Sequence, residues 1–330
     1  MLGGLFPRMG SVLKTPRHTG VVLKVLLGGS VFAWMVQSGK LDLARVGKSL
    51  SHWPLMLAII TLAYVQVGIV TWRWELLLRA QSIFLPFRRA WGLTMIGMLF
   101  NVVIPGAVGG DLIKGYYITR ANAARKSHAA TTLLMDRATG LIGLLILGAV
   151  MVLAGWSETM KSAATRSLGL LTVGGAAGGL VVLYAAAMAG KSISSWTFLP
   201  AAIRNVFDAL HEYRSRRAVI PIALVLSIFN QALSCAMYYL ALRATGVTDL
   251  PASQFFLIVP LGLVTMALPI SPGGIGVGQA AFFTLFRIVA PDYAAPGTDA
   301  LTVFQLMFIL VCISGLYWYI SYKHPEGQSG

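Results

Sequence analysis

Charged residues are scarce in this sequence. Asp, Glu, Lys and Arg make up 11% of its 330 residues, whereas 57% are hydrophobic. Because an average soluble protein has about 25% charged residues, this composition argues against a water-soluble fold. Acidic residues are the rarer kind, 11 against 26 basic ones, which gives a formal net charge of +15. Basic residues of membrane proteins gather in cytoplasmic loops and at lipid head groups, so we expect no nucleic-acid partner.

Groups that could carry catalysis or bind metal are also few. The two cysteines, Cys235 and Cys312, lie inside apolar runs, which indicates neither a disulfide framework nor a metal site. The five histidines fall in expected loops, termini or at a span edge. Neither a Gly-rich phosphate loop after a strand nor a paired metal-ligand spacing is present. We therefore predict no cofactor, no metal and no catalytic residue, and a transporter rather than an enzyme.

Long apolar runs recur along the whole chain, and each approaches the roughly 20 residues that a helix needs to cross a bilayer. Arg8, Lys14 and Arg17 precede the first run as in a signal peptide, but no small-residue cleavage site follows, which favours an uncleaved helix. The six predicted spans are about Val21 to Val36, Pro54 to Trp72, Ala129 to Ala154, Leu168 to Ala189, Ala218 to Leu242 and Ala300 to Tyr322.

Two further apolar stretches are interrupted by prolines and glycines: Trp91 to Tyr117 and Phe255 to Val289. The first arm of the earlier stretch, Trp91 to Ile104, would be only about 21 Å long as a helix, against a hydrocarbon core of roughly 30 Å. Non-helical backbone at membrane depth is tolerated only where protein buries it or a wet cavity adjoins it. We predict that both stretches are re-entrant helical hairpins, with eight or more full spans as the alternative.

The basic residues support this topology. With both hairpins re-entrant and the N-terminus in the cytoplasm, most of the 26 basic residues fall on the cytoplasmic side. Two full crossings per hairpin would leave the same residues inside, so charge does not separate the alternatives. The sequence predicts a multi-pass protein of the cell membrane, in a bacterium the inner membrane, with both termini in the cytoplasm.

The order of elements repeats. Span, span, hairpin, span describes residues 20–155 and again residues 156–322, between a cytoplasmic segment 1–19 and a tail 323–330. Each half has three crossings, so the second copy would start from the opposite face. Corresponding interrupted segments of such inverted repeats indicate a transporter's binding site.

The first hairpin and the next span hold the candidate ionisable residues. A helix starting near Gly110 would direct its positive end inward, where an anion could bind. Asp111 at that start is equally read as a helix cap, and Lys114 as a side chain that snorkels to the cytoplasmic head groups. Asp136 and Arg137 lie inside the next span, where charges are costly; they could form a structural ion-pair network or contact substrate.

The second hairpin carries no formal charge between Leu268 and Gln279, so it cannot relay protons by itself. Its glycines permit close backbone approach or positive φ, or else only tight helix packing. The residues predicted to bind substrate are Asn101, Pro105, Gly109, Gly110, Asp111, Lys114, Asp136 and Arg137 in the first half, and Pro269, Ser271, Pro272, Gly273, Gly274, Gly276 and Gln279 in the second.

These motifs together resemble the lysylphosphatidylglycerol synthase transmembrane family, also called flippase-like domain proteins. The resemblance rests on Asn-x-x-x-Pro with Gly-Gly-Asp-x-x-Lys, on the pair Asp136 and Arg137, and on Leu-Pro-x-x-Pro-Gly-Gly-x-Gly-x-x-Gln. The family usually has Glu where this chain has Asp111, Asp136 and Gln279, so the last change removes a charge. Members that make lysyl-phosphatidylglycerol carry a further soluble transferase domain, and this chain is similar to the flippase part alone.

The resemblance implies a lipid translocase, in which the two hairpins enclose a polar slot for a phosphate-bearing head group. The expected partner is a membrane phospholipid or a polyprenyl-linked lipid, and a homo-oligomer is compatible with the sequence. The alternative is a membrane-embedded transferase or an accessory subunit of a lipid-modification or glycan pathway.

Overall fold

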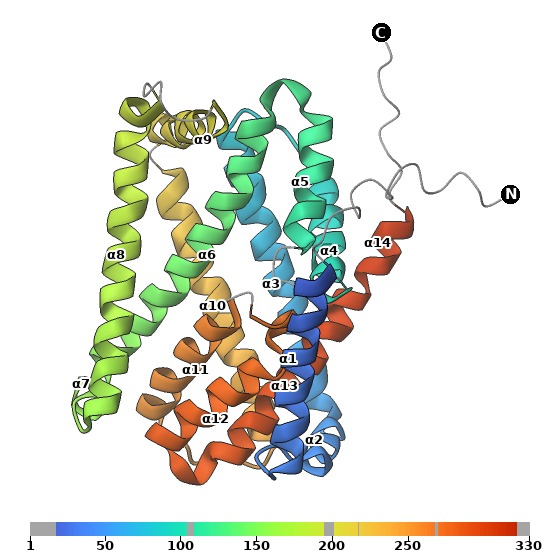
Figure 1. Ribbon diagram of the computed structural model, residues 1–330, viewed down its shortest axis with the longest axis vertical. Coiled ribbons are helices and arrows are strands. Elements are labelled where there is room, and N and C mark those ends of the chain that lie inside the picture. Colours follow the sequence, from blue (N-terminus) through green and yellow to red (C-terminus); the bar gives the residue numbers. More distant parts are fainter. Residues whose placement is uncertain (1–17, 104–108, 195–200, 217, 268–269, 322–330) are drawn as a thin grey trace, which may run out of the picture.

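The computed structural model describes residues 18–103, 109–194, 201–216, 218–267 and 270–321 (Figure 1). In these ranges helix is the only regular secondary structure, as predicted. The long helices are α1 (His18–Gln37), α3 (Trp53–Ala80), α6 (Lys126–Ala154), α8 (Ala163–Ser194), α10 (Val219–Ala244) and α13 (Ala294–Ile313), which is followed by α14 (Gly315–Ser321). Three shorter helices connect them, α2 (Leu43–Leu50), α7 (Trp156–Thr159) and α9 (Ala201–Glu212), together with the 3-10 turns η2 (Ala123–Arg125), η3 (Tyr213–Ser215) and η5 (Pro291–Tyr293).

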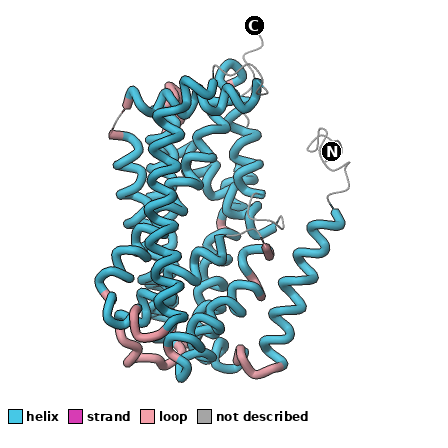
Figure 2. The backbone as a smooth tube through the Cα atoms, turned by 60° about the vertical axis from the view of Figure 1, so that its left-hand side comes forward, coloured by secondary structure: helices cyan, strands magenta, loops and turns pink. Residues whose placement is uncertain are grey.

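Each of the first five predicted spans lies on one helix, and the sixth, Ala300 to Tyr322, lies on α13 and α14 as far as the structure describes it. Five segments of the described chain are both long and apolar enough to cross a bilayer: Trp53–Ala80, Lys126–Ala154, Ala163–Ala186, Val219–Ala244 and Pro291–Ser321. The apolar segment of α1, Val25–Gln37, is shorter. Figure 2 shows α1 at the edge of the bundle, where it packs against α12 and η4.

The α3 helix is longer than the span predicted from the sequence. The predicted span ends at Trp72, yet the helix continues to Ala80, and the chain turns only at Gln81 and Ser82. No Gly or Pro interrupts residues 73–80, so the backbone hydrogen bonds run on past the apolar run. Arg73 and Glu75 are therefore buried inside the bundle.

Both interrupted stretches fold as pairs of packed helices. The first consists of α4 (Phe87–Val103) and α5 (Gly109–Ala121), and the second of α11 (Ala252–Ala267), the turn η4 (Pro272–Gly274) and α12 (Val277–Val289). Their lengths of 17, 13, 16 and 13 residues correspond to about 20–26 Å, less than a roughly 30 Å hydrocarbon core.

The two pairs occupy opposite ends of the long axis. In Figure 1, α4 and α5 lie toward the end that carries α9, whereas α11 and α12 lie toward the end that carries α2 and α7. The turn η4 packs against α4, so the two pairs also touch each other.

Large apolar side chains cover the outside as well as the core. The main core cluster joins α3, α10, α11, α12 and α13. On the peripheral helix α8, Leu171, Val181, Val182 and Tyr184 are each at least 65% exposed. A face of this kind is unfavourable in water and is the one that a helix presents to lipid.

Candidate functional site

Close backbone contact builds the first hairpin. A Cβ on Gly110 would lie 2.0 Å from the carbonyl oxygen of Gly97, so only glycine lets α5 approach α4 this closely. The α5 helix begins at Gly109, as expected, and the side-chain oxygen of Asn101 accepts a hydrogen bond of 2.8 Å from the Gly110 N–H. Asn101 on α4 thus satisfies one of the N–H groups left free at the start of α5.

Lys114 lies one turn into α5 and is buried, with 5% of its surface exposed. Its Nζ is 4.0 Å from the ring centroid of Trp74 on α3, a cation–π contact, and its stem runs along Gly97. The indole Nε1 of Trp74 in turn donates to Thr132 on α6 at 3.2 Å. The interpretation of Lys114 as a side chain that snorkels to the head groups is therefore wrong, because Trp74 and Gly97 hold the side chain inward.

Asp136 of α6 forms the most enclosed ion pair of the described chain with Arg73. The Arg73 Nε donates to Asp136 Oδ1 at 2.8 Å, and the two side chains are 6% and 12% exposed. The Nη1 of Arg73 also donates to Ser227 Oγ on α10 at 2.7 Å. Arg73 thus links α3 to both α6 and α10, and the charges of Arg73 and Asp136 compensate each other inside the bundle.

The next residue, Arg137, points elsewhere and pairs with Asp111 at the start of α5. This second ion pair is more open, since the side chains are 45% and 22% exposed. Asp136 and Arg137 thus each form an ion pair, as a structural network requires, and direct substrate contact stays a prediction. Asp111, interpreted as an ordinary helix cap, is in the first turn of α5 and joins it to α6.

The cluster as a whole carries an excess of positive charge. Three cations, Arg73, Lys114 and Arg137, face two carboxylates, Asp111 and Asp136, and the other four charges all act electrostatically on the ammonium of Lys114. Each carboxylate already has an arginine partner. Lys114 is the one basic residue of this cluster that has no carboxylate within ion-pair distance among the described residues.

Side-chain amides close the tip of the second hairpin. Gln279 Oε1 accepts from the Gly276 N–H at 2.7 Å, and its Nε2 donates to Gln305 Oε1 on α13 at 2.6 Å. The Nε2 of Gln305 then donates to the Gly273 carbonyl at 3.1 Å. Gln279 is 1% exposed, and both the oxygen and the nitrogen of its amide are used in hydrogen bonds within the protein. A carboxylate could not donate the second bond, which gives a physical reason for glutamine at this position.

The glycines of this tip are required by conformation. Gly273, Gly274 and Gly276 have φ of 58°, 73° and 80°, in the left-handed region. A Cβ on Gly276 would also lie 2.0 Å from the carbonyl oxygen of Gly28 on α1. Ser271 is buried beside them, and its Oγ has no hydrogen-bond partner among the described residues.

The structure brings the predicted residues together in two groups. Asn101, Gly110, Asp111, Lys114, Asp136 and Arg137 form the first, and Ser271, Gly273, Gly274, Gly276 and Gln279 form the second. Pro105 and Pro269 lie outside the described residues, and Pro272 begins η4. Sequence reasoning missed Arg73, Trp74 and Gln305. The absence of a helix breaker after Trp72 was the available signal for the first two.

Packed apolar helices, a lipid-facing exterior and a buried charged cluster at a helical hairpin define this chain as a polytopic helical membrane protein. It belongs to the lysylphosphatidylglycerol synthase TM region family, whose model matches residues 21–315. A "UPF0104 membrane protein" of Methanothermobacter thermautotrophicus is 24% identical over 314 residues, covering 86% of this chain and 90% of the relative. A second protein of that name and organism is 23% identical, covering 93% and 95%. None of the solved structures matches the chain significantly.

Proposed function

We propose that the protein is a lipid translocase that moves a phosphate-bearing lipid across the bilayer through a polar slot between the two hairpins. The observation that carries the proposal is the buried side chain of Lys114, in a cluster of three basic and two acidic residues. An ionisable residue inside a membrane bundle is costly and marks a functional site by default. A phosphate group is the anion that such a basic side chain, aided by Arg137 and the positive end of the α5 helix, would bind.

The helix pairs support the mode of transport. Each arm is shorter than the hydrocarbon core, so we infer that both pairs re-enter, from opposite faces, as parts of an inverted repeat. Their contact, η4 against α4, would then lie inside the membrane. Ser271 near the tip and Thr94 on α4 each hold a buried hydroxyl with no hydrogen-bond partner among the described residues. Such hydroxyls are available to water or to a passing head group.

Transport also fits the chemistry of the cluster better than catalysis does. Asp111 and Asp136 are each held in an ion pair, so neither is poised as a general base. A transferase would need a free acid, base or nucleophile beside the bound lipid. We therefore favour movement of the whole lipid without a covalent step.

The test is a flipping assay with the full chain reconstituted in vesicles that contain fluorescent phospholipids. Lys114→Gln keeps a polar side chain of similar length but removes the charge, and we expect at least about a tenfold loss of rate, equivalent to about 1.4 kcal/mol. Arg120→Gln removes a charge from the exposed end of the same helix and should transport as the wild type does. Equal rates for wild type and Lys114→Gln, with all proteins folded, would contradict the proposed site.

A further inference from the structure

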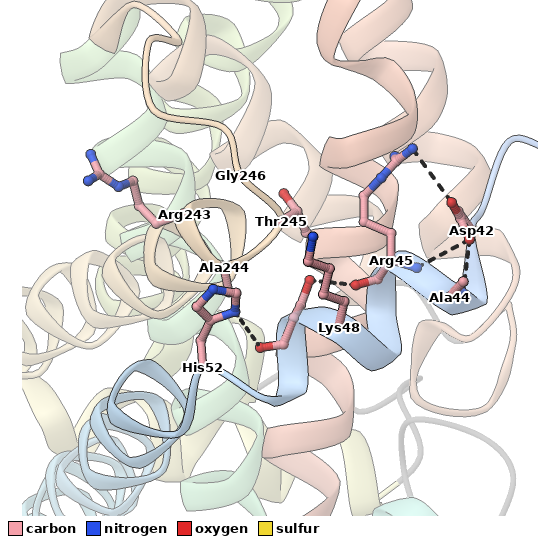
Figure 3. A pocket seen from close by; sticks show the side chains of 10 residues that line it. Asp42, Ala44, Arg45, Lys48, His52, Arg243, Ala244, Thr245 and Gly246 are labelled. Carbon is pink, nitrogen blue, oxygen red and sulfur yellow. Dashed lines mark hydrogen bonds and ion pairs between the residues drawn. The ribbon is translucent and has the colours of Figure 1, made fainter.

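A second basic site lies at the opposite end of the molecule, between α2 and the end of α10. The structure has a pocket of about 500 Å³ there, a volume suited to a small ligand. Its charged or titratable lining residues are Asp42, Arg45, Lys48, His52 and Arg243. Figure 3 shows the Lys48 side chain extending toward Thr245, with Arg45 on one side and His52 and Arg243 on the other.

The protein itself satisfies the negative groups of this pocket. Asp42 accepts from the backbone N–H groups of Ala44 and Arg45 as the cap of α2. Arg45 donates to Asp299, a fully buried carboxylate of α13, at 2.7 Å. The last carbonyls of α10 accept from the backbone N–H groups of Thr245 and Gly246.

Two of the basic side chains that line the pocket have no carboxylate partner among the described residues. Among the described residues, neither Lys48 nor Arg243 forms an ion pair, and both are exposed at the pocket. His52 adds a ring whose Nδ1 is 3.3 Å from the Ser49 carbonyl oxygen. The pocket therefore offers two exposed cations to an anion, while its acidic residue is fixed by the helix cap.

Apolar side chains beside the pocket favour a lipid over a free anion. Leu43, Trp53 and Leu57 are 52%, 71% and 57% exposed on α2 and the start of α3. Trp at the end of a spanning helix is typical of the membrane interface, where head groups lie. We propose that this pocket binds the phosphate of an anionic phospholipid head group, whose acyl chains run along Leu57.

The test measures binding of short-chain phosphatidylglycerol to the detergent-solubilised full chain, with short-chain phosphatidylcholine and inorganic phosphate as comparisons. The double variant Lys48→Gln/Arg243→Gln should weaken phosphatidylglycerol binding by about 25-fold, since each cation near a head group contributes roughly fivefold. Arg166→Gln/Arg287→Gln is the matched control, because it removes two exposed cations that do not line the pocket. Thermal unfolding verifies that both double variants fold.

Repeating the titrations in the Lys114→Gln background separates this site from the one at the first hairpin. The proposal is supported if phosphatidylglycerol binding persists in Lys114→Gln and is lost when Lys48→Gln/Arg243→Gln is added. This result does not depend on whether the protein translocates lipid. An equal loss in both double variants would overturn it in favour of general surface charge. Inorganic phosphate that binds as tightly as the lipid would overturn the lipid assignment, and equal affinity for phosphatidylcholine would overturn the requirement for an anionic head group.

Discussion

At the residue scale, adjacent positions of α6 serve different partners. Successive residues of an α-helix point about 100° apart, so Asp136 faces α3 while Arg137 faces α5. Asp136 is held by Arg73 in a pair that water barely reaches, and Arg137 reaches Asp111 in a more open pair. The first pair fixes the bundle, and the second is the one that a substrate could displace at lower cost.

This difference predicts a large effect of Arg73→Ala on stability. Removing the arginine leaves Asp136 buried and unpaired, which typically costs about 3–5 kcal/mol. The double variant Arg73→Met/Asp136→Met removes both charges and should regain much of the loss. Thermal unfolding in detergent measures the stability of both variants. Arg88→Ala is the control, because Arg88 is exposed. If the double variant is no more stable than Arg73→Ala, the two side chains do not depend on each other.

At the element scale, single glycines decide how closely helices approach. Gly110 meets the Gly97 backbone within the first hairpin, and Gly276 meets Gly28 where the second hairpin touches α1. Small residues at helix contacts are the general means of tight packing in membranes, where no hydrophobic effect drives helices together. Here they also set the positions of Asn101 and Gln279, whose side chains bond the same tips.

Gly110→Ala should therefore disrupt the first hairpin. Its Cβ would overlap the Gly97 carbonyl, and backbone atoms cannot move aside as a flexible side chain can. We expect a lower thermal midpoint and loss of lipid flipping. Gly174→Ala is the control, since nothing lies within 4 Å of a Cβ there and alanine stabilises a helix interior by roughly 0.5–1 kcal/mol. A Gly110→Ala protein as stable as Gly174→Ala would contradict the close contact.

At the scale of the whole molecule, the two hairpins lie toward opposite ends of a bundle whose outside is apolar (Figure 1). The charged cluster is at one hairpin and the basic pocket at the end of α2, so an anionic head group could be held near either face.

Cysteine labelling in intact membranes tests the orientation. The inverted-repeat hypothesis predicts that Arg88→Cys, Lys126→Cys and Arg214→Cys are labelled from one side, and Lys48→Cys from the other. All four positions are exposed, and the native Cys235 and Cys312 are buried, so background labelling should be low. Labelling of positions 88 and 126 from opposite sides would mean that the first hairpin crosses the membrane once, and the hypothesis would fail.

The sequence by itself determined the helical class, the two interrupted stretches and the first group of site residues. Apolar length, helix breakers and the cost of charge in lipid are local properties, so they can be read along the chain. It also indicated Asn101, Asp111, Lys114 and Arg137 as candidate substrate-binding residues, and the structure brings them together.

Only the tertiary structure decided which charges pair and which remain available. The partner of Asp136 is 63 residues away on α3, and that of Arg45 is 254 residues away on α13. Neither pairing can be predicted from the local sequence pattern. The pattern of a helix specifies which face a residue lies on, but not which other helix packs against that face. The burial of Lys114 against Trp74, the amide chain at Gln279 and the pocket beside Lys48 all depend on that packing.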